Sequence, residues 1–262
     1  MAADAPLIAG PLKVWVERDG KLLRLRLARP KANIVDAAMI AALQGAFDAH
    51  RGNSGLVAVL LDAEGPHFSF GASVEEHLAG RCAAMLAGLH ALILAMLDFP
   101  APILAVVKGQ CLGGGLELAM GGSLIFAAQD AKLGQPEIQL GVFAPAASVL
   151  LPPRIGQAAA EDLLFSGRTL AAPEAHALGL VSTISADPQA AALAYFDKHL
   201  APRSASSLAC AVAAARGGYL AEVRRRIAEV ELLYLDRLMQ TRDANEGLAA
   251  FIAKRQPRWE HR

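Results

Sequence analysis

The sequence predicts an α/β fold that ends in a helical portion. Continuously apolar runs at residues 56–61, 103–107 and 123–127 are typical of strands buried on both faces of a sheet. Helical stretches separate these runs, and strands that alternate with helices pair in parallel through right-handed crossovers. From residue 157 onward the spacing of apolar side chains is almost entirely helical.

The first 50 residues indicate a hairpin and a helix. Residues 12–16 and 23–27 alternate apolar and polar side chains around a turn at 19–20, which favours antiparallel pairing. Asp36 can cap a helix over residues 37–49, because its carboxylate can accept a hydrogen bond from an amide of the first turn.

The rest of the chain is interpreted as helices and loops. A long helix is expected over residues 74–97, a short one over 116–120, and a turn over 144–148. Further helices are expected at residues 158–165, 173–178, 190–200, 204–215, 219–238 and 243–254. No internal repeat has a fixed period. We therefore divide the chain into an α/β core, residues 1–200, and a helical C-terminal region, residues 201–262.

Composition and charge argue against disorder and against nucleic-acid binding. Hydrophobic residues make up 54% of the 262 residues and charged residues 19%, so a large core can form and apolar surface remains for contacts between subunits. Lys plus Arg and Asp plus Glu number 25 each, whereas nucleic-acid binders show a basic excess. The one basic cluster, residues 224–226, is flanked by glutamates at helical spacing and is interpreted as a solvated helix face.

The cysteines and the termini suggest a cytoplasmic protein without a metal site. Cys82, Cys111 and Cys210 have no disulfide or zinc spacing, and each is expected to be a buried, inert thiol. Residues 1–6 carry no signal-peptide pattern. The most apolar run, residues 82–97, is shorter than the roughly 20 residues that a membrane span needs.

The stretch KGQCLGGGLE at residues 108–117 is the first part of the sequence that suggests chemistry. It follows a predicted strand and opens a predicted helix, and its glycines let the backbone turn sharply and leave N–H groups accessible. With the partial positive charge of a helix N-terminus, such a loop can hold an oxyanion or a phosphate. The spacing is not that of a P-loop or of a dinucleotide-binding loop. Taken alone, the glycines can equally serve close packing of a helix on a strand.

Two further features favour catalysis. A second glycine-containing loop, FSFGAS at residues 68–73, also follows a buried run and can offer the N–H of Ala72. Glu137 lies 20 residues after Glu117, and Glu117 has apolar neighbours, where a carboxylate is costly to bury without a function or a partner. Two carboxylates near two amide donors suggest an acid/base pair.

At these residues the chain resembles the crotonase (enoyl-CoA hydratase/isomerase) superfamily, and the resemblance runs over nearly its whole length. The matching motifs are LARPKAN at 27–33, FGAS at 70–73, GGGLE at 113–117, GQPE at 134–137, the segment 162–180 and the C-terminal stretch 246–255. Each motif alone is weak, but together they are specific.

The resemblance implies a crotonase-like spiral of ββα units, with a helical end that forms a homotrimer or a hexamer. It implies that the Ala72 and Gly114 N–H groups hold the thioester oxygen and that Glu117 and Glu137 hold the water. From this pairing we predict that Glu117 activates the water and that Glu137 protonates the carbon α to the thioester. We expect the acyl-CoA to contact Lys31, Ala32, Phe70, Gly71, Gly113, Phe143 and Lys254. Coenzyme A is part of the substrate, so no cofactor and no metal are expected.

Two departures from the family pattern bear on the substrate. Ser73 stands where the family often has Asp, and APAAS at 144–148 replaces a glycine-rich turn, which adds side-chain bulk beside the acyl pocket. The run FSFGASVEEH at 68–77 resembles the cyclohexa-1,5-diene-1-carbonyl-CoA hydratases of anaerobic aromatic degradation. His77 faces either the acyl pocket or solvent, and Phe68, Phe70 and Phe143 either line an alicyclic pocket or belong to the core.

The leading hypothesis is therefore a hydratase that adds water to a conjugated enoyl- or dienoyl-CoA. The alternatives are a general enoyl-CoA hydratase of fatty-acid oxidation, an isomerase or hydrolase of CoA thioesters, and a non-catalytic or RNA-binding scaffold. The zero net charge and the intact acid pair count against the last of these.

Overall fold

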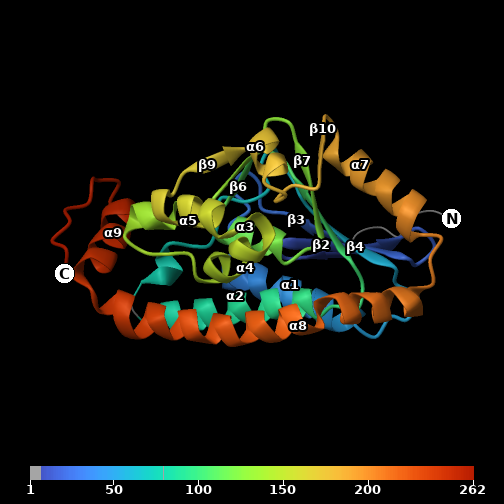
Figure 1. The fold of residues 1–262 in the computed structure, drawn as a ribbon, viewed down its shortest axis with the longest axis horizontal. Helices are drawn as coiled ribbons and strands as arrows, with labels where there is room; N and C mark the ends of the chain where they lie inside the picture. Colours follow the sequence, from blue (N-terminus) through green and yellow to red (C-terminus); the bar gives the residue numbers. More distant parts are fainter. Residues whose placement is uncertain (1–6, 79) are drawn as a thin grey trace.

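The computed structural model describes residues 7–78 and 80–262. Its main feature is a seven-stranded sheet with the strand order β1-β2-β3-β4-β5-β7-β10 (Figure 1). The first three strands, β1 (Leu7–Ala9), β2 (Leu12–Glu17) and β3 (Leu22–Leu27), pair antiparallel, which confirms the predicted hairpin.

From β3 onward the sheet is parallel. The parallel strands after β3 are β4 (Ala58–Ala63), β5 (Ile103–Val107), β7 (Leu124–Ala128) and β10 (Thr183–Ser185). The apolar runs predicted to be buried strands are thus confirmed, and they occupy the centre of the sheet, where both faces are covered.

Each face of the sheet has its own core. Leu23 and Leu25 of β3 pack in one cluster with residues of α1 (Ala37–His50) and α2 (Cys82–Leu97). The neighbouring side chain, Leu22, packs in a second cluster with α7 (Pro188–Tyr195) and the π-helical turn that follows it. Successive strand residues point to opposite faces, so one strand supplies both cores.

A second, smaller sheet gives the fold its spiral form. It contains β6 (Gln110–Leu112), β8 (Lys132–Gly134) and β9 (Thr169–Ala171), with β6 and β8 parallel. Ser69 makes an isolated parallel bridge with Cys111 beside it. The chain therefore passes from the large sheet to the small one three times in succession, after β4, β5 and β7, which is the expected spiral of ββα units.

The remaining helices surround these sheets. They are α3 (Gly114–Met120), α4 (Pro145–Ile155), α5 (Gln157–Ser166), α6 (Ala172–Ala177), α8 (Ala205–Leu232) and α9 (Arg242–Ile252). Short 3-10 or π-helical turns are formed by Glu75–His77, Pro136–Leu140, Phe196–Leu200, Leu233–Arg237 and Leu238–Gln240. Helix α8 runs beside α2 along much of the molecule and leads to α9 at the opposite end from α7 (Figure 1).

Three predicted helices, one after the first glycine loop and two in the C-terminal region, had wrong bounds. The helix expected over residues 74–97 begins only at Cys82, because Leu78 is extended and Gly80 has a φ of +87°, which an α-helix does not contain. The two helices expected over 204–215 and 219–238 are one helix, α8, which continues through Gly217 and Gly218. Glycine in a helix costs only about 1 kcal/mol relative to alanine, and packing against α2 and α4 supplies more than that.

The turn expected over residues 144–148 was also wrong. Ala144 is the N-cap of α4, and Pro145 opens the helix at the position where proline is best tolerated. The later Pro152 and Pro153 stand in the last turn of the helix. Residues 144–148 therefore lack glycine because they form the start of a helix and not a turn.

Several smaller expectations have mixed outcomes. Cys82 and Cys111 are buried, but Cys210 is exposed on α8, where an inert buried thiol was expected. Arg225 pairs with Glu222 and Glu229 on the exposed face of α8, which confirms the solvated basic cluster.

No helix of the described chain is long and apolar enough to cross a membrane. The expectation for residues 1–6 lies outside the described residues, and the division at residue 200 stays a prediction.

Asn33 ties together the loops that precede α1 and the first glycine loop. It is fully buried and has a φ of +45°, a conformation that asparagine tolerates better than most residues. Its Nδ2 donates to the carbonyl oxygens of Glu64 and His67 at 2.9 and 3.0 Å, and its Oδ1 accepts from the N–H of Arg29 at 3.0 Å. One side chain therefore satisfies three backbone groups.

We predict that Asn33→Ala lowers the free energy of unfolding by about 2–3 kcal/mol, because it leaves buried backbone groups without partners. Urea unfolding at one fixed protein concentration measures this. Asn53→Ala, which removes a hydrogen bond from an exposed loop, is the control and should change stability by less than about 0.5 kcal/mol. Equal effects of the two substitutions would contradict the role of Asn33.

Candidate active site

The glycine loops and one of the two glutamates line a single large cavity. Its volume is about 1120 Å³, and it is lined by Phe70, Gly71, Ala72, Gly113 and Glu137 together with parts of α9 and the C-terminal tail. Five of the residues predicted from the sequence as site residues therefore share one cavity.

Ala72 and Gly114 place two free amides next to each other. A Cβ atom on Gly114 would lie only 3.0 Å from the Ala72 nitrogen. Neither N–H donates a hydrogen bond to any residue in the described parts of the chain. The preceding residues, Gly71 at φ +111° and Gly113 at φ +51°, adopt backbone conformations that favour glycine. Two unpaired, adjacent donors are what an oxyanion hole requires.

The two amides have different local supports. Gly114 is the first residue of α3, so the helix N-terminus adds partial positive charge there. Ala72 does not open a helix, contrary to the expectation, because only a 3-10 turn follows its loop. That loop is held by Ser69, whose buried hydroxyl donates to the Asn33 carbonyl at 2.8 Å and accepts from the Gly71 N–H at 3.1 Å.

Glu117 lies in α3 directly behind the second amide. Its side chain is buried, with a residue exposure of 3%. Its Oε1 accepts a hydrogen bond from the Ala147 N–H at 2.8 Å, at the N-terminus of α4. Burial raises the pKa of Glu117, while the Ala147 N–H and the nearby charge of His90 act in the opposite direction. The Ala147 contact stabilises a carboxylate because an amide can only donate to it.

Glu137 projects from the 3-10 turn after β8 and lies over the second glycine loop. A Cβ atom on Gly113 would overlap its Oε1 atom, so only glycine leaves room for the carboxyl group. Burial raises the pKa of Glu137 to about 8, and the negative charge of Glu117 adds to the rise. The buried Gln135 side chain lies against this carboxyl group, within 3.0 Å of its Oε2.

The pair is therefore unsymmetrical. Two carboxyl groups in the same buried site cannot both ionise easily, so the one with better donors carries the charge. Glu117 has the Ala147 amide, whereas Glu137 feels the charge of Glu117. Near neutral pH the arrangement offers one carboxylate that can accept a proton and one carboxylic acid that can donate one.

Other predicted contact residues lie outside the cavity. Lys31 and Lys254 are exposed and do not line it in this chain. Ala32 acts through its backbone, since its carbonyl accepts a hydrogen bond from the Phe70 N–H at 2.9 Å. Phe143 packs edge-on against Tyr234, with ring centroids 5.2 Å apart, and belongs to the apolar wall behind the cavity.

For several residues the sequence did not decide whether the side chain faces the cavity, and the structure places some of them at the cavity and others in the core. His77 lines the cavity, with Nδ1 2.7 Å from the Ser73 carbonyl, and burial lowers its pKa. Ser73 also lines the cavity and donates to Glu75 at 3.0 Å. Phe68 is fully buried in the core, whereas Phe70 lines the cavity.

Sequence reasoning missed residues whose role depends on tertiary contacts. Ala147 supplies a backbone N–H to Glu117 from a helix that was interpreted as a turn. Trp259 packs against Gly141 and Gly247 at the cavity; a Cβ on either glycine would lie 3.0 Å from its ring. The absence of a glycine-rich turn at 144–148 was the only sequence signal for Ala147, and nothing in the sequence singled out Trp259.

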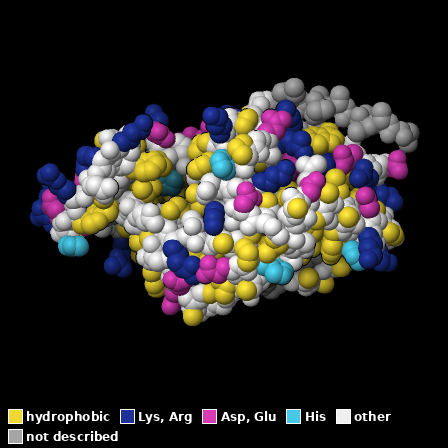
Figure 2. Space-filling model, turned by 90° about the horizontal axis from the view of Figure 1, so that it is seen from above, with side chains coloured by type: hydrophobic (Ala, Val, Ile, Leu, Met, Phe, Trp, Pro, Cys, Tyr) yellow, Lys and Arg dark blue, Asp and Glu magenta, His cyan; other side chains and the backbone are white. Residues whose placement is uncertain are grey.

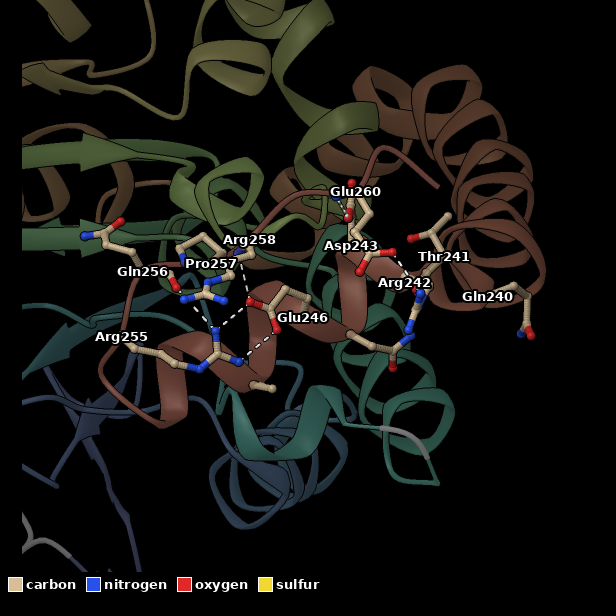
Figure 3. A pocket seen from close by; sticks show the side chains of 12 residues that line it. Gln240, Thr241, Arg242, Asp243, Glu246, Arg255, Gln256, Pro257, Arg258 and Glu260 are labelled. Atoms are coloured by element: carbon tan, nitrogen blue, oxygen red, sulfur yellow. Dashed lines mark hydrogen bonds and ion pairs between the residues drawn. The ribbon is translucent and has the colours of Figure 1, made fainter.

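A second hollow lies between α9 and the C-terminal tail (Figure 3). Its walls are charged and contain two ion pairs, Arg255 with Glu246 and Arg242 with Glu260. The tail is further fixed by Asp243, which accepts from the N–H groups of Glu260 and His261 at 2.7 and 2.8 Å. These contacts anchor the tail and leave no acid/base pair for chemistry.

Charged side chains of both signs are distributed over the face of the molecule shown in Figure 2. In the view of Figure 2, positive and negative side chains are interspersed and no broad basic surface is present on that face. Among the described residues, no group of three or more His, Cys, Asp and Glu side chains is placed to hold a metal ion.

Comparisons with known proteins agree with the geometry. A cyclohexa-1,5-dienecarbonyl-CoA hydratase of Thauera aromatica is 62% identical over 254 residues, covering 97% of this chain and 98% of that protein. A probable enoyl-CoA hydratase of Bacillus subtilis is 32% identical, covering 90% of this chain and 94% of that protein. The structure of an enoyl-CoA hydratase from Mycobacterium avium subsp. paratuberculosis superimposes with a TM-score of 0.84 at 23% identity, over 96% of this chain and 99% of that one, and shows the same fold. The model of the enoyl-CoA hydratase/isomerase family matches residues 17–262, and the chain belongs to that family.

Proposed function

We propose that this protein is a hydratase that adds water to a conjugated, cyclic dienoyl-CoA thioester of the cyclohexa-1,5-diene-1-carbonyl type. The reaction class is supported by one observation: the unsymmetrical pair Glu117 and Glu137 lies beside the two amides of the glycine loops, which donate no hydrogen bond within the described chain. The acyl group is supported by the name and the 62% identity of the Thauera aromatica relative. Such a role belongs to anaerobic breakdown of aromatic compounds.

The reaction follows from the placement of the donors and acceptors. The Glu117 carboxylate accepts a proton from water while the water oxygen bonds to the carbon β to the thioester. The electron pair of the double bond moves toward the thioester oxygen, where the Ala72 and Gly114 N–H groups stabilise the negative charge. Glu137 then donates its proton to the carbon at which the charge returns. Turnover leaves the proton on Glu117, and exchange within the pair restores the starting state.

The shape of the cavity favours a compact acyl group. The glutamate pair is backed by an apolar wall that includes Leu86, Val142, Phe143 and Tyr234. Ala144, Ala146 and Ala147 of α4 are buried beside Glu117, where a glycine-rich turn would leave more space. This bulk favours a ring over a long straight chain.

A substrate panel tests the proposal. Linear enoyl-CoA thioesters and cyclic mono- and dienoyl-CoA thioesters are compared by kcat/KM, with ¹⁸O-labelled water to detect incorporation. The cyclic diene should give the highest kcat/KM, with label in the product. Double-bond migration without label would indicate an isomerase, and release of free coenzyme A would indicate a hydrolase. Preference for a linear substrate would indicate a general enoyl-CoA hydratase.

Binding of coenzyme A itself stays a prediction. The Ala32 backbone, Lys31 and Lys254 are its proposed contacts, together with Phe70, Gly71 and Gly113 at the cavity. No cofactor beyond the coenzyme A of the substrate is part of the proposed mechanism. We also propose a cytoplasmic location, supported by three cysteines without disulfide spacing.

We predict that Glu117→Gln or Glu137→Gln lowers kcat by about 10²–10⁴, because each removes one proton-transfer group. Binding of a substrate analogue, measured by calorimetry, should change little. Glu161→Gln, on the exposed face of α5, is the control and should keep the full rate. Near-normal hydration by both single variants would refute the assignment.

Gly114 provides a test of the oxyanion hole. Gly114→Ala brings a methyl group to 3.0 Å from the Ala72 nitrogen, so the two amides must separate. A lost donor costs about 2.7–4 kcal/mol, or about 10²–10³ in kcat. We expect a loss in that range for Gly114→Ala and no measurable turnover for Gly114→Val, with the fold retained by circular dichroism. Gly217→Ala, in open space on α8, should stay fully active; an equally active Gly114→Ala would contradict the model.

The pH dependence of kcat/KM should be bell-shaped. Glu137 must be protonated, and its raised pKa of about 8 places the loss of activity on the alkaline side near pH 8. Glu117 must be ionised. Because burial raises its pKa, activity on the acidic side should be lost at a pH above the usual pKa of a glutamate. Rates from pH 5 to 10 measure both limbs. Constant activity to pH 10 would show that Glu137 is not the acid.

We also predict a homotrimer or hexamer with its contacts in the C-terminal region. Leu232, Leu233, Phe251 and Ile252 are large apolar side chains there, each at least 41% exposed in the single chain. Exposed apolar patches of this kind mark subunit contacts. Sedimentation velocity at micromolar concentration should show an assembly several times heavier than 27.4 kDa; a 27.4 kDa species alone would contradict the prediction.

A further inference from the structure

Helix α4 contacts helix α3, which carries Glu117, at two separate places. The first contact is the hydrogen bond from the Ala147 N–H to Oε1 of Glu117, which is 2.8 Å long. The second lies toward the C-terminal ends of both helices, where Nη2 of Arg154 donates to the carbonyl oxygens of Met120 and Gly122 at 2.5 and 2.6 Å. The mechanism above uses the first contact and gives no role to the second.

The two contacts come from one side of α4. Ala147 and Arg154 are seven residues apart, which is about two turns of an α-helix, so both residues lie on the side that faces α3. Along the helix axis they are about 10 Å apart. Helices α3 and α4 are in contact and lie next to each other in Figure 1. A helix that is held against its neighbour at two such points cannot slide or rotate without breaking one of the contacts.

Arg154 binds the end of α3 at which the backbone needs donors. The last carbonyl groups of a helix have no intrahelical partner, and a cation is favoured there by hydrogen bonding and by the helix dipole. Arg154 is partly buried, and its Nε is buried without a hydrogen-bond partner in the described chain. The two carbonyl oxygens therefore fix where the end of this side chain lies.

The position of the α3 end determines the position of Glu117. Met120 lies three residues after Glu117, and all seven residues of α3 are buried. Such a short helix moves as one unit, so the bonds to Arg154 also set the distance between the Glu117 carboxyl group and the Ala147 amide. If this distance grew, Glu117 would lose a donor that stabilises its ionised form.

We propose that Arg154 is a positioning residue, whose two hydrogen bonds to the end of α3 keep the Ala147 N–H on the Glu117 carboxyl group. The inference rests on the proposed function, since Glu117 is the base of that reaction. The alternative is a cap that only stabilises α3. A cap affects stability alone, whereas a positioning residue also affects the protection of the Ala147 amide and the pH at which Glu117 ionises.

The other titratable groups near Glu117 are unchanged by a substitution of Arg154. Those that act on Glu117 or lie on an element packed against α3 are His90 on α2, Cys111 on β6, Glu137 on the turn after β8 and Tyr234 on the π-helical turn Leu233–Arg237. Arg154 donates no hydrogen bond to any of these four side chains in the described chain.

Arg154→Met removes the two bonds and keeps an unbranched side chain. The Ala147 amide should then exchange its hydrogen faster, measured by mass spectrometry of peptides that cover residues 145–151. The acid limb of the kcat/KM profile, where activity falls as Glu117 is protonated, should move upward by about 0.5–1 pH unit, or about a three- to tenfold loss below the limb. Lysine has one nitrogen that can donate to both carbonyl oxygens, so Arg154→Lys should restore most of both properties.

Arg216→Met is the matched control. Arg216 on α8 also donates to carbonyl oxygens at a helix end, those of Met96 and Leu97 at 3.4 and 2.8 Å, and to the Ser123 hydroxyl at 2.6 Å. These bonds join α8 to the end of α2 and involve no residue of α3 or α4. Arg216→Met should lower the Tm but leave the exchange of the Ala147 amide and the acid limb unchanged.

Three results would overturn the proposal in favour of the simple cap. They are an unchanged acid limb in Arg154→Met, an equal upward shift in Arg216→Met, and a shift in Arg154→Lys as large as that in Arg154→Met. If Arg154→Met does not fold, Arg154→Gln, whose side chain is too short to reach both carbonyl oxygens, is measured in its place. An upward shift in that variant supports the proposal and an unchanged limb overturns it.

The two readouts also separate this inference from the proposed function. An unmodified enzyme that hydrates no enoyl-CoA refutes the function, and the exchange of the Ala147 amide then decides whether Arg154 holds that contact. An active enzyme in which neither the exchange nor the acid limb responds to Arg154→Met refutes the inference alone.

Discussion

Parallel pairing of three short segments, the one at Ser69 and the strands β6 and β8, positions the proposed catalytic groups. Ser69 pairs with Cys111, and Cys111 pairs with Leu133, so three successive passes of the chain lie side by side in register. Ala72 and Gly114 each follow their paired residue by three positions, and Glu137 follows Leu133 by four. Because parallel strands end at the same edge, equal offsets along the chain become neighbours in space. If this register were lost, the two amides and the Glu137 carboxyl group would no longer lie together.

This stacking explains where glycine is required and where it is not. The first two passes approach so closely that a Cβ on Gly115 would lie 2.6 Å from the Ser69 Cβ, and one on Gly114 would lie 3.0 Å from the Ala72 nitrogen. At Gly113 the space is taken by the Glu137 carboxyl group. Close packing, one of the two explanations that the sequence offered for these glycines, is therefore confirmed, and their service to ligand access stays a prediction.

The sequence predicted the elements better than their boundaries and contacts. Alternating and continuous apolar runs located the hairpin and the central strands, and the family motifs identified the loops that meet at the cavity. The start of α2 at Cys82 was missed because the single Gly80 interrupts an otherwise helical pattern. The spiral has unequal spacing along the chain, because the stretches of helix, strand and loop that separate Ser69, Cys111 and Leu133 differ in length, so no fixed repeat reveals it. The amide of Ala147 could not be found because backbone groups leave no signal in a sequence.

In the proposed mechanism, helix α4 decides which glutamate carries the charge and also limits the acyl group. Two buried carboxyl groups of the same type would share one proton equally unless their surroundings differ. The N-terminus of α4 breaks the symmetry, because the Ala147 N–H donates a hydrogen bond to Glu117, whereas Glu137 lies beside the negative charge of Glu117. That amide belongs to a glycine-free helix start, residues 144–147, in which Ala144, Ala146 and Ala147 are buried. In the proposed complex these alanines reduce the volume beside the reacting carbons, so the helix start that stabilises the Glu117 carboxylate would also restrict the acyl group.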